Sequence, residues 1–180
     1  ADELIGWMRL RGFTGNVDDY YDPENSFLHR VLDRGLGIPI TLSVVAIEVG
    51  RRCGVHLVGV GLPGEFVVAE RDAPDRFHNP FRGRSMTPDD VRALVRRFAG
   101  PSAELTEPMR RPVPAIDIVR RMLNNLGSIY GELDQLDQLR WVFRMQTALP
   151  GAAPGAHRHL AAVLARLGRS WEAIEVLEAL

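Results

Sequence analysis

Residues 37–54 read GIPITLSVVAIEVGRRCG. Their apolar side chains point in nearly every direction around a helical wheel, and no polar face begins before Glu48. This pattern predicts a buried core helix rather than an amphipathic surface helix. Pro39 suits the first turn, because its missing N–H would have no partner there. Gly54 suits the left-handed residue that ends a helix.

Short apolar runs follow the predicted helix. Residues 55–62 and 65–70 are predicted strands on either side of Pro63-Gly64, and residues 77–81 are a third short strand after a polar hairpin loop at 71–76. A buried helix followed by a small antiparallel sheet predicts the α+β fold class.

Two further helices have clear starting signals. Asp22 and Pro23 predict an N-cap and a first helical residue, and Gly35 predicts the end of that helix. Thr87 and Pro88 predict the start of another helix by the same logic.

The C-terminal part of the chain has a different pattern. Four prolines lie within residues 101–114, which predicts a linker between a domain at 1–100 and a helical region at 115–180. The helical pattern repeats at an offset of 34 residues, which aligns Leu126 with Leu160. A 34-residue period of paired helices is typical of tetratricopeptide repeats.

Composition narrows the function classes. The chain has 180 residues and a net charge of −1, so charge gives no reason to expect binding to nucleic acid or to a membrane surface. All 22 basic residues are arginine, which leaves no side-chain amine as a nucleophile.

The single cysteine, Cys53, excludes a disulfide within the chain. The sequence has no signal-peptide pattern and no apolar run long enough to span a membrane, so we expect a cytoplasmic protein.

No metal or cofactor site is expected. The five histidines are scattered, and His157 and His159 are two positions apart, so they do not share a helix face. The acidic residues near Asp18 lack the spacing of a calcium loop.

Four motifs occur in order along the chain: GFTGNVDDYYDPENSFLHRVL, GIPITLSVVAIEVGRRCGVHLVGVGLPGEFVV, FHNPFRG and IVRRMLNNLGSIYGELDQL. Together they resemble the SirB family of transglutaminase-like proteins with C-terminal tetratricopeptide repeats. This resemblance implies a papain-like α+β core, in which a buried helix packs on a small antiparallel sheet, followed by helical repeats. It also implies a Cys–His–Asp triad.

The triad positions hold other residues. The family places its nucleophile at the start of the buried helix, where this chain has only the hydroxyls of Thr41 and Ser43. Glu65 stands where the family has histidine, and Asn79 stands where it has aspartate. Cys53 lies about 18 Å along the helix from the nucleophile position, so it cannot substitute for the thiol.

The degenerate triad favours a protein that is not an enzyme. We expect a protein-interaction or regulatory module on a pseudo-transglutaminase core, with a protein partner bound by the tetratricopeptide-like helices. The alternative is a hydrolase or acyltransferase in which Thr41 or Ser43 is the nucleophile and Glu65 and Asn79 assist it. A third possibility is a regulatory subunit that stabilises a larger assembly through Trp171 and its apolar neighbours.

Overall fold

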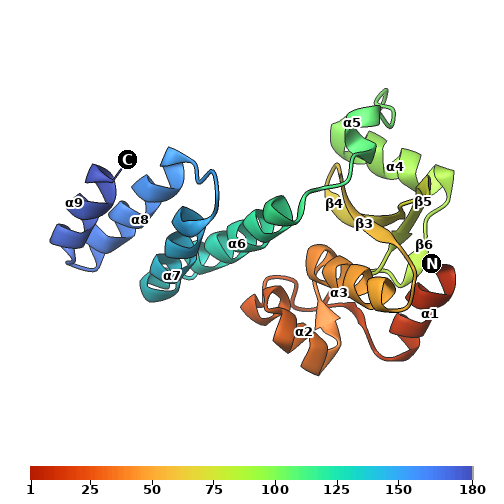
Figure 1. The fold of residues 1–180 in the computed structure, drawn as a ribbon, viewed down its shortest axis with the longest axis horizontal. Coiled ribbons are helices and arrows are strands. Elements are labelled where there is room, and N and C mark those ends of the chain that lie inside the picture. The colour runs from red at the N-terminus through yellow and green to blue at the C-terminus, as the bar shows by residue number, and fades with distance from the viewer. Residues whose placement is uncertain (180) are drawn as a thin grey trace. The chain divides into compact units, whose positions relative to one another are not determined.

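The structure is a computed structural model that describes residues 1–179, and it divides into two compact units, Ala1–Pro114 and a second unit that begins at Ala115. The first unit combines helices with a small antiparallel sheet, and the second is helical (Figure 1). The predicted α+β fold class is therefore confirmed.

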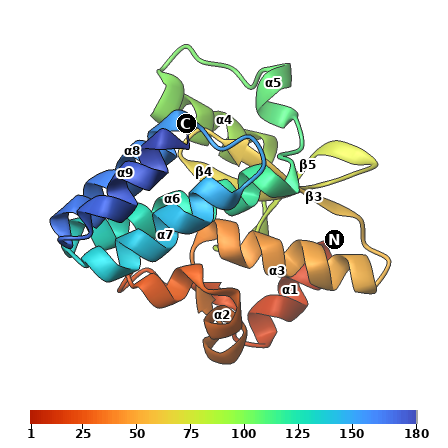
Figure 2. The same cartoon turned by 60° about the vertical axis from the view of Figure 1, so that its left-hand side comes forward.

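A four-stranded antiparallel sheet is the centre of the first unit. Its strands lie in chain order, and each pairs with the next. Helix α3 covers one face of the sheet and helix α4 lies on the other (Figure 2). The strands and the two helices are β3 (Leu57–Leu62), β4 (Glu65–Glu70), β5 (Ala73–Asn79), β6 (Arg84–Ser85), α3 (Pro39–Arg52) and α4 (Pro88–Ala99).

Helix α3 is the predicted buried helix. Leu42 and Ala46 are fully buried and pack with Val68 of β4 and with α1 (Asp2–Leu10). On the opposite face of the sheet, Val67 packs with α4. Adjacent side chains of a strand point to opposite faces, so alternate residues of β4 belong to the two apolar clusters.

The segment before α3 is less regular than its sequence pattern suggests. Asp22 caps the predicted start, but the helix is split into a 3₁₀ turn, η1 (Pro23–Ser26), and α2 (Leu28–Arg34), because Phe27 between them is extended. Gly35 ends α2 in the left-handed conformation, as predicted. Two short strands, β1 (Thr14–Gly15) and β2 (Leu36–Gly37), pair in parallel around this segment.

The predicted hairpin loop at 71–76 was too long. Strand β5 begins at Ala73, so only residues 71 and 72 form the turn. Pro74 weakens the strand signal in the sequence because it lacks an N–H. It is tolerated here because it lies in the register shift of the pairing with β4, and because β6 pairs only with His78 and Asn79.

The proline-rich stretch 101–114 packs on the first unit. It contains α5 (Glu107–Arg110), and the Val113 N–H donates to the Gly59 carbonyl at 2.8 Å. Leu105 and Met109 lie against the apolar cluster under α4. The boundary between the units therefore follows Pro114, at the end of this stretch.

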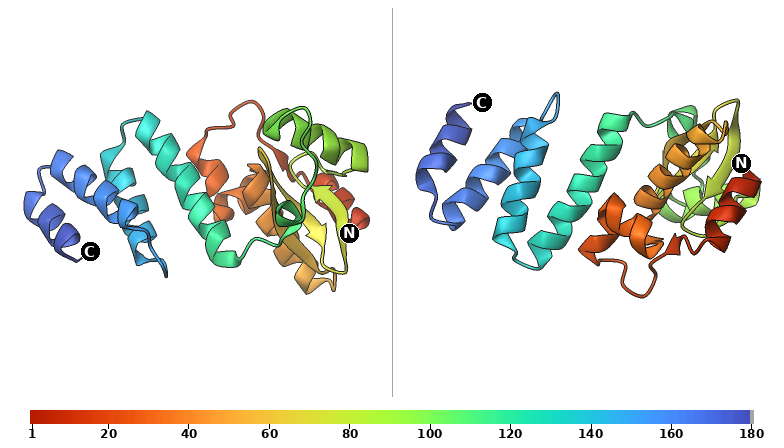
Figure 3. Two further views of the ribbon diagram at one scale, coloured as in Figure 1. Left: turned by 90° about the horizontal axis from the view of Figure 1, so that it is seen from above. Right: turned by 60° about the horizontal axis from the view of Figure 1, so that its bottom comes forward.

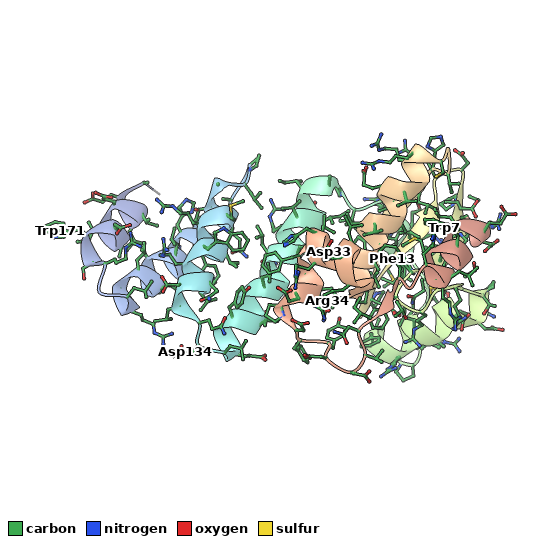
Figure 4. All side chains as sticks on the ribbon, turned by 90° about the horizontal axis from the view of Figure 1, so that it is seen from below. Trp7, Phe13, Asp33, Arg34, Asp134 and Trp171 are labelled. Atoms are coloured by element: carbon green, nitrogen blue, oxygen red, sulfur yellow. The ribbon has the colours of Figure 1, made fainter. Side chains whose placement is uncertain are left out.

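Within residues 115–179, the second unit consists of four helices. Each helix packs on the next (Figures 1 and 3). They are α6 (Ala115–Glu132), α7 (Leu136–Ala148), α8 (Pro154–Arg166) and α9 (Ser170–Glu178). The last residues of α6 and α8 are 34 positions apart, as are the first residues of α7 and α9. Trp171 projects from α9 and is 81% exposed (Figure 4). No helix among residues 1–179 is long and apolar enough to cross a membrane.

Candidate functional site

Glu65 and Asn79 come together at one end of the sheet. Glu65 is the first residue of β4 and Asn79 is the last residue of β5, and these strands run antiparallel. Alternation along each strand puts Glu65 on the same face as Val67, and Asn79 on the same face as Phe77. Both of those apolar side chains pack toward α4. The two polar residues therefore lie on the α4 side of the sheet.

The Glu65 carboxylate is held by one hydrogen bond and one ion pair. The Asn79 side-chain amide donates to Glu65 Oε1 at 2.9 Å, and Arg82 Nε lies 3.5 Å from the same oxygen. Asn79 Oδ1 in turn accepts the Arg82 backbone N–H at 3.0 Å. Asn79 is 1% exposed, and the Glu65 side chain is 9% exposed. A nearly buried carboxylate is tolerated when it is paired and hydrogen-bonded in this way.

The Thr41 hydroxyl forms hydrogen bonds with backbone groups. It donates to the Asn25 carbonyl at 2.8 Å and accepts the Ile38 N–H at 3.1 Å, and the residue is fully buried. The second bond satisfies one of the free N–H groups at the start of α3. Thr41 thus closes the first turn of the helix and ties it to the segment before α2.

Ser43 is also fully buried, but its hydroxyl has no hydrogen-bond partner among residues 1–179. Within the same range, no hydrogen bond joins Glu65 to Ser43 or Thr41. Cys53 is exposed at the far end of α3. Within residues 1–179, a hydrogen bond therefore joins two of the four candidate residues, Glu65 and Asn79, and neither hydroxyl bonds to them.

His78 occupies the opposite face of the sheet from Asn79. Its Nδ1 lies 2.8 Å from Ser85 Oγ and its Nε2 lies 3.1 Å from Glu70 Oε1. Burial lowers the pKa of His78, against the opposing effects of Glu70 and Asp2. The Ser85 hydroxyl donates to Asp2 and lowers the pKa of that carboxyl. This network joins α1 to the edge of the sheet, and the sequence analysis missed it.

A pocket of about 170 Å³ opens beside Glu65 and Asn79. One wall comes from the β5–β6 turn and β6, which carry Arg82 and Arg84. The other wall comes from α4. The α4 residues that line the pocket lie at positions i, i+3, i+4 and i+7, which share one helix face. They are Asp90, Ala93, Leu94 and Arg97. This spacing is visible in the sequence, but no site was predicted on this helix face.

The three arginines of this pocket differ in their pairing. Arg84 binds both oxygens of Asp90, at 2.8 and 2.9 Å. Arg84 and Thr87 hold the pKa of Asp90 well below its usual range, so this pair stays ionised. Arg82 is near Glu65. Arg97 lies over the Phe98 ring, and within residues 1–179 it forms no ion pair.

The arrangement suits binding better than nucleophilic chemistry. A hydroxyl nucleophile needs a base within about 3.2 Å, and Glu65 instead faces Asn79 and Arg82. No group of three or more potential metal ligands occurs among residues 1–179. The pocket therefore presents guanidinium groups and a short apolar wall to a ligand.

The comparisons with known proteins agree with this architecture. A family model described as the transglutaminase-like superfamily matches residues 4–124. A UPF0162 protein of Xylella fastidiosa is 39% identical over 132 residues, which are 71% of this chain and 47% of that protein. A UPF0162 protein of Pseudomonas aeruginosa is 33% identical over 130 residues, 72% of this chain and 48% of that protein.

A eukaryotic protein also matches. Mouse F-box only protein 21 is 30% identical over 136 residues, which are 70% of this chain and 21% of that protein. The chain thus spans about half the length of the bacterial relatives that it matches. No solved structure matches it.

Proposed function

Since the chain belongs to the transglutaminase-like superfamily, we propose that it is a non-catalytic protein-interaction or regulatory module. Its core keeps the superfamily's architecture without the Cys–His–Asp triad. The helical unit is the part that binds a protein partner.

One observation carries the non-catalytic part of the proposal: within residues 1–179, Glu65 forms no hydrogen bond with either hydroxyl. Thr41 gives its hydroxyl to backbone groups, and Glu65 accepts from Asn79. An activated hydroxyl nucleophile requires a hydrogen-bonded base, and the base requires an orienting group. Here the candidate base, Glu65, and the candidate orienting group, Asn79, bind each other, and neither bonds to a hydroxyl at the nucleophile positions within residues 1–179.

The helical unit supports the interaction part. Its helix pairs repeat after 34 residues, the period of tetratricopeptide repeats, which present an extended surface to their partners. On α9, Trp171 is 81% exposed, and Ile174 is 45% exposed three positions later. These two side chains share a helix face and give a partner an apolar anchor.

A second function has one observation in its favour. The Ser43 hydroxyl forms no hydrogen bond within residues 1–179, whereas the Thr41 hydroxyl bonds to backbone groups. A hydrolase or acyltransferase would use this hydroxyl after a rearrangement that brings Glu65 to it. Such an enzyme would form a covalent acyl adduct on Ser43.

The test uses affinity capture from a native-host lysate together with intact mass measurement. The proposal expects a partner that is retained by Glu65→Ala and lost by the double variant Trp171→Ala and Ile174→Ala. Leu10→Ala, at an 88% exposed site in the first unit, is the control for nonspecific apolar binding. A Glu65-dependent covalent adduct after incubation with a fluorophosphonate would instead establish the hydrolase alternative.

A further inference from the structure

The pocket beside Glu65 carries one more positive charge than negative charge. Three guanidinium groups line it, against the carboxylates of Glu65 and Asp90. Asp90 is paired with Arg84, and Glu65 lies next to Arg82. The charge in excess is therefore that of Arg97, which forms no ion pair within residues 1–179.

The shape and lining of the pocket restrict the ligand further. A volume of about 170 Å³ is that of a small pocket and favours a small ligand. The wall between the charged groups is apolar and consists of Met86, Ala93 and Leu94. A small ligand with a short aliphatic stem would cover this wall.

The charge balance distinguishes between anions. A guanidinium group presents parallel N–H donors that match a planar carboxylate. A dianionic phosphate would bring two negative charges to a pocket that has one positive charge in excess. It would also lie close to the carboxylates of Glu65 and Asp90. A singly charged carboxylate neutralises the pocket without that repulsion.

We propose that this pocket binds a carboxylate on a short aliphatic stem, with Arg97 as its main charge partner and Leu94 against the stem. The carboxylate belongs either to a free acid or to an acidic side chain of a peptide. The proposal does not depend on the partner surface of the helical unit, because every residue it uses is in the first unit.

The experiment is an amide NMR titration of the full chain with four probes. N-acetylglutamate α-amide represents an acidic peptide side chain, and pentanoate represents a free acid. N-acetylglutamine α-amide is the neutral match of the first probe, and inorganic phosphate is the competing anion. We expect saturable shifts at the amides of Ala93 and Arg97 with at least one of the two carboxylates. The neutral amide should bind at least tenfold more weakly, because it lacks the charge-assisted hydrogen bond.

Two variants on one helix make the test specific. Arg97→Gln should weaken carboxylate binding by about tenfold or more. Arg96→Gln is the matched control, because Arg96 is also exposed on α4 but does not line the pocket. Both variants remove one surface charge, so a nonspecific charge effect would weaken binding equally in the two.

The carboxylate that binds more tightly identifies the source of the ligand, and either one supports the proposal. Three results would overturn it: no saturable binding of either carboxylate at millimolar concentration, equal loss in the two variants, or tighter binding of phosphate. None of these results would bear on capture of a partner through Trp171.

Discussion

The Asn79 side-chain amide donates to Glu65 Oε1 at 2.9 Å, across the end of two antiparallel strands. These two residues occupy the positions where the resemblance to the SirB family implies an aspartate and a histidine. In this chain they satisfy each other's polar groups, with help from Arg82. The pair has thus become part of the structural framework of the sheet, and its hydrogen bonds should be measurable as stability.

Replacing Asn79 should therefore destabilise the first unit. Asn79→Ala removes the amide that donates to Glu65 and the oxygen that accepts the Arg82 N–H, and it leaves a nearly buried carboxylate with fewer donors. We expect a loss of about 2–3 kcal/mol in the free energy of unfolding, measured by urea denaturation.

Glu65→Gln is the matched change at the other end of the same hydrogen bond. It keeps an acceptor oxygen for Asn79 and removes the buried charge, so its cost should be below about 1 kcal/mol. If Glu65→Gln costs as much as Asn79→Ala, the carboxylate charge itself holds this end of the sheet together.

Gly35 should tolerate substitution much less well than Gly54. Both have a positive φ, +73° at Gly35 and +76° at Gly54. A Cβ at Gly35 would lie 2.5 Å from the Gly12 carbonyl oxygen, whereas a Cβ at Gly54 would meet no atom within 4 Å. Gly54→Ala should cost about 1 kcal/mol for the left-handed backbone alone.

Gly35→Ala adds a clash with backbone, which cannot rotate away as a side chain can. We expect a loss of at least about 2 kcal/mol more than for Gly54→Ala, read from the midpoints of thermal unfolding. Equal costs for the two substitutions would mean that the segment around Gly12 moves aside without penalty.

The sequence predicted α3 well and the start of β5 poorly, for one physical reason. The burial of α3 follows from its own residues, because its apolar side chains surround the helix and Pro39 and Gly54 mark its ends. The start of β5 depends on its neighbours: Pro74 is acceptable because it lies in the irregular part of the pairing with β4 and beyond the reach of β6. Local patterns cannot report where a neighbouring strand ends.

The candidate site was also predicted only in part from the sequence. The sequence predicted Glu65 as the first residue of a strand, as observed, but it placed Asn79 in the middle of a strand at 77–81, whereas β5 ends at Asn79. The arginines of the pocket come from the sheet and from α4, and their meeting depends on how that helix packs. Thr41 and Ser43 were predicted as nucleophiles assisted by Glu65, but residue spacing could not show that the Thr41 hydroxyl bonds to the backbone at Ile38 and Asn25.

Thr87 should contribute to stability as the N-cap of α4. Its hydroxyl accepts the Asp90 N–H at 3.1 Å, and the Asp90 carboxylate accepts the Thr87 N–H at 2.8 Å. Thr87→Ala should cost about 1 kcal/mol, measured by urea denaturation.

Thr106 is the matched control, because it precedes α5 without a side-chain capping bond. Thr106→Ala should change stability by less than about 0.5 kcal/mol. A similar cost at both positions would assign the effect of Thr87→Ala to lost packing rather than to the cap.

His78 should make the stability of the first unit depend on pH. Burial lowers the pKa of its imidazole below the ordinary value of 6.5, so the unfolded chain binds a proton more readily than the folded chain does. The stability that neutral His78 provides is complete above about pH 6.5, and it is lost as the pH falls through the window between 6.5 and the lowered folded value.

His78→Gln should flatten this part of a plot of unfolding free energy against pH, whereas His56→Gln, at an exposed site, should leave its slope unchanged. Greater wild-type stability at pH 5.5 than at pH 7.5, lost in His78→Gln, would mean that Glu70 and Asp2 outweigh burial and hold the imidazole protonated in the folded protein.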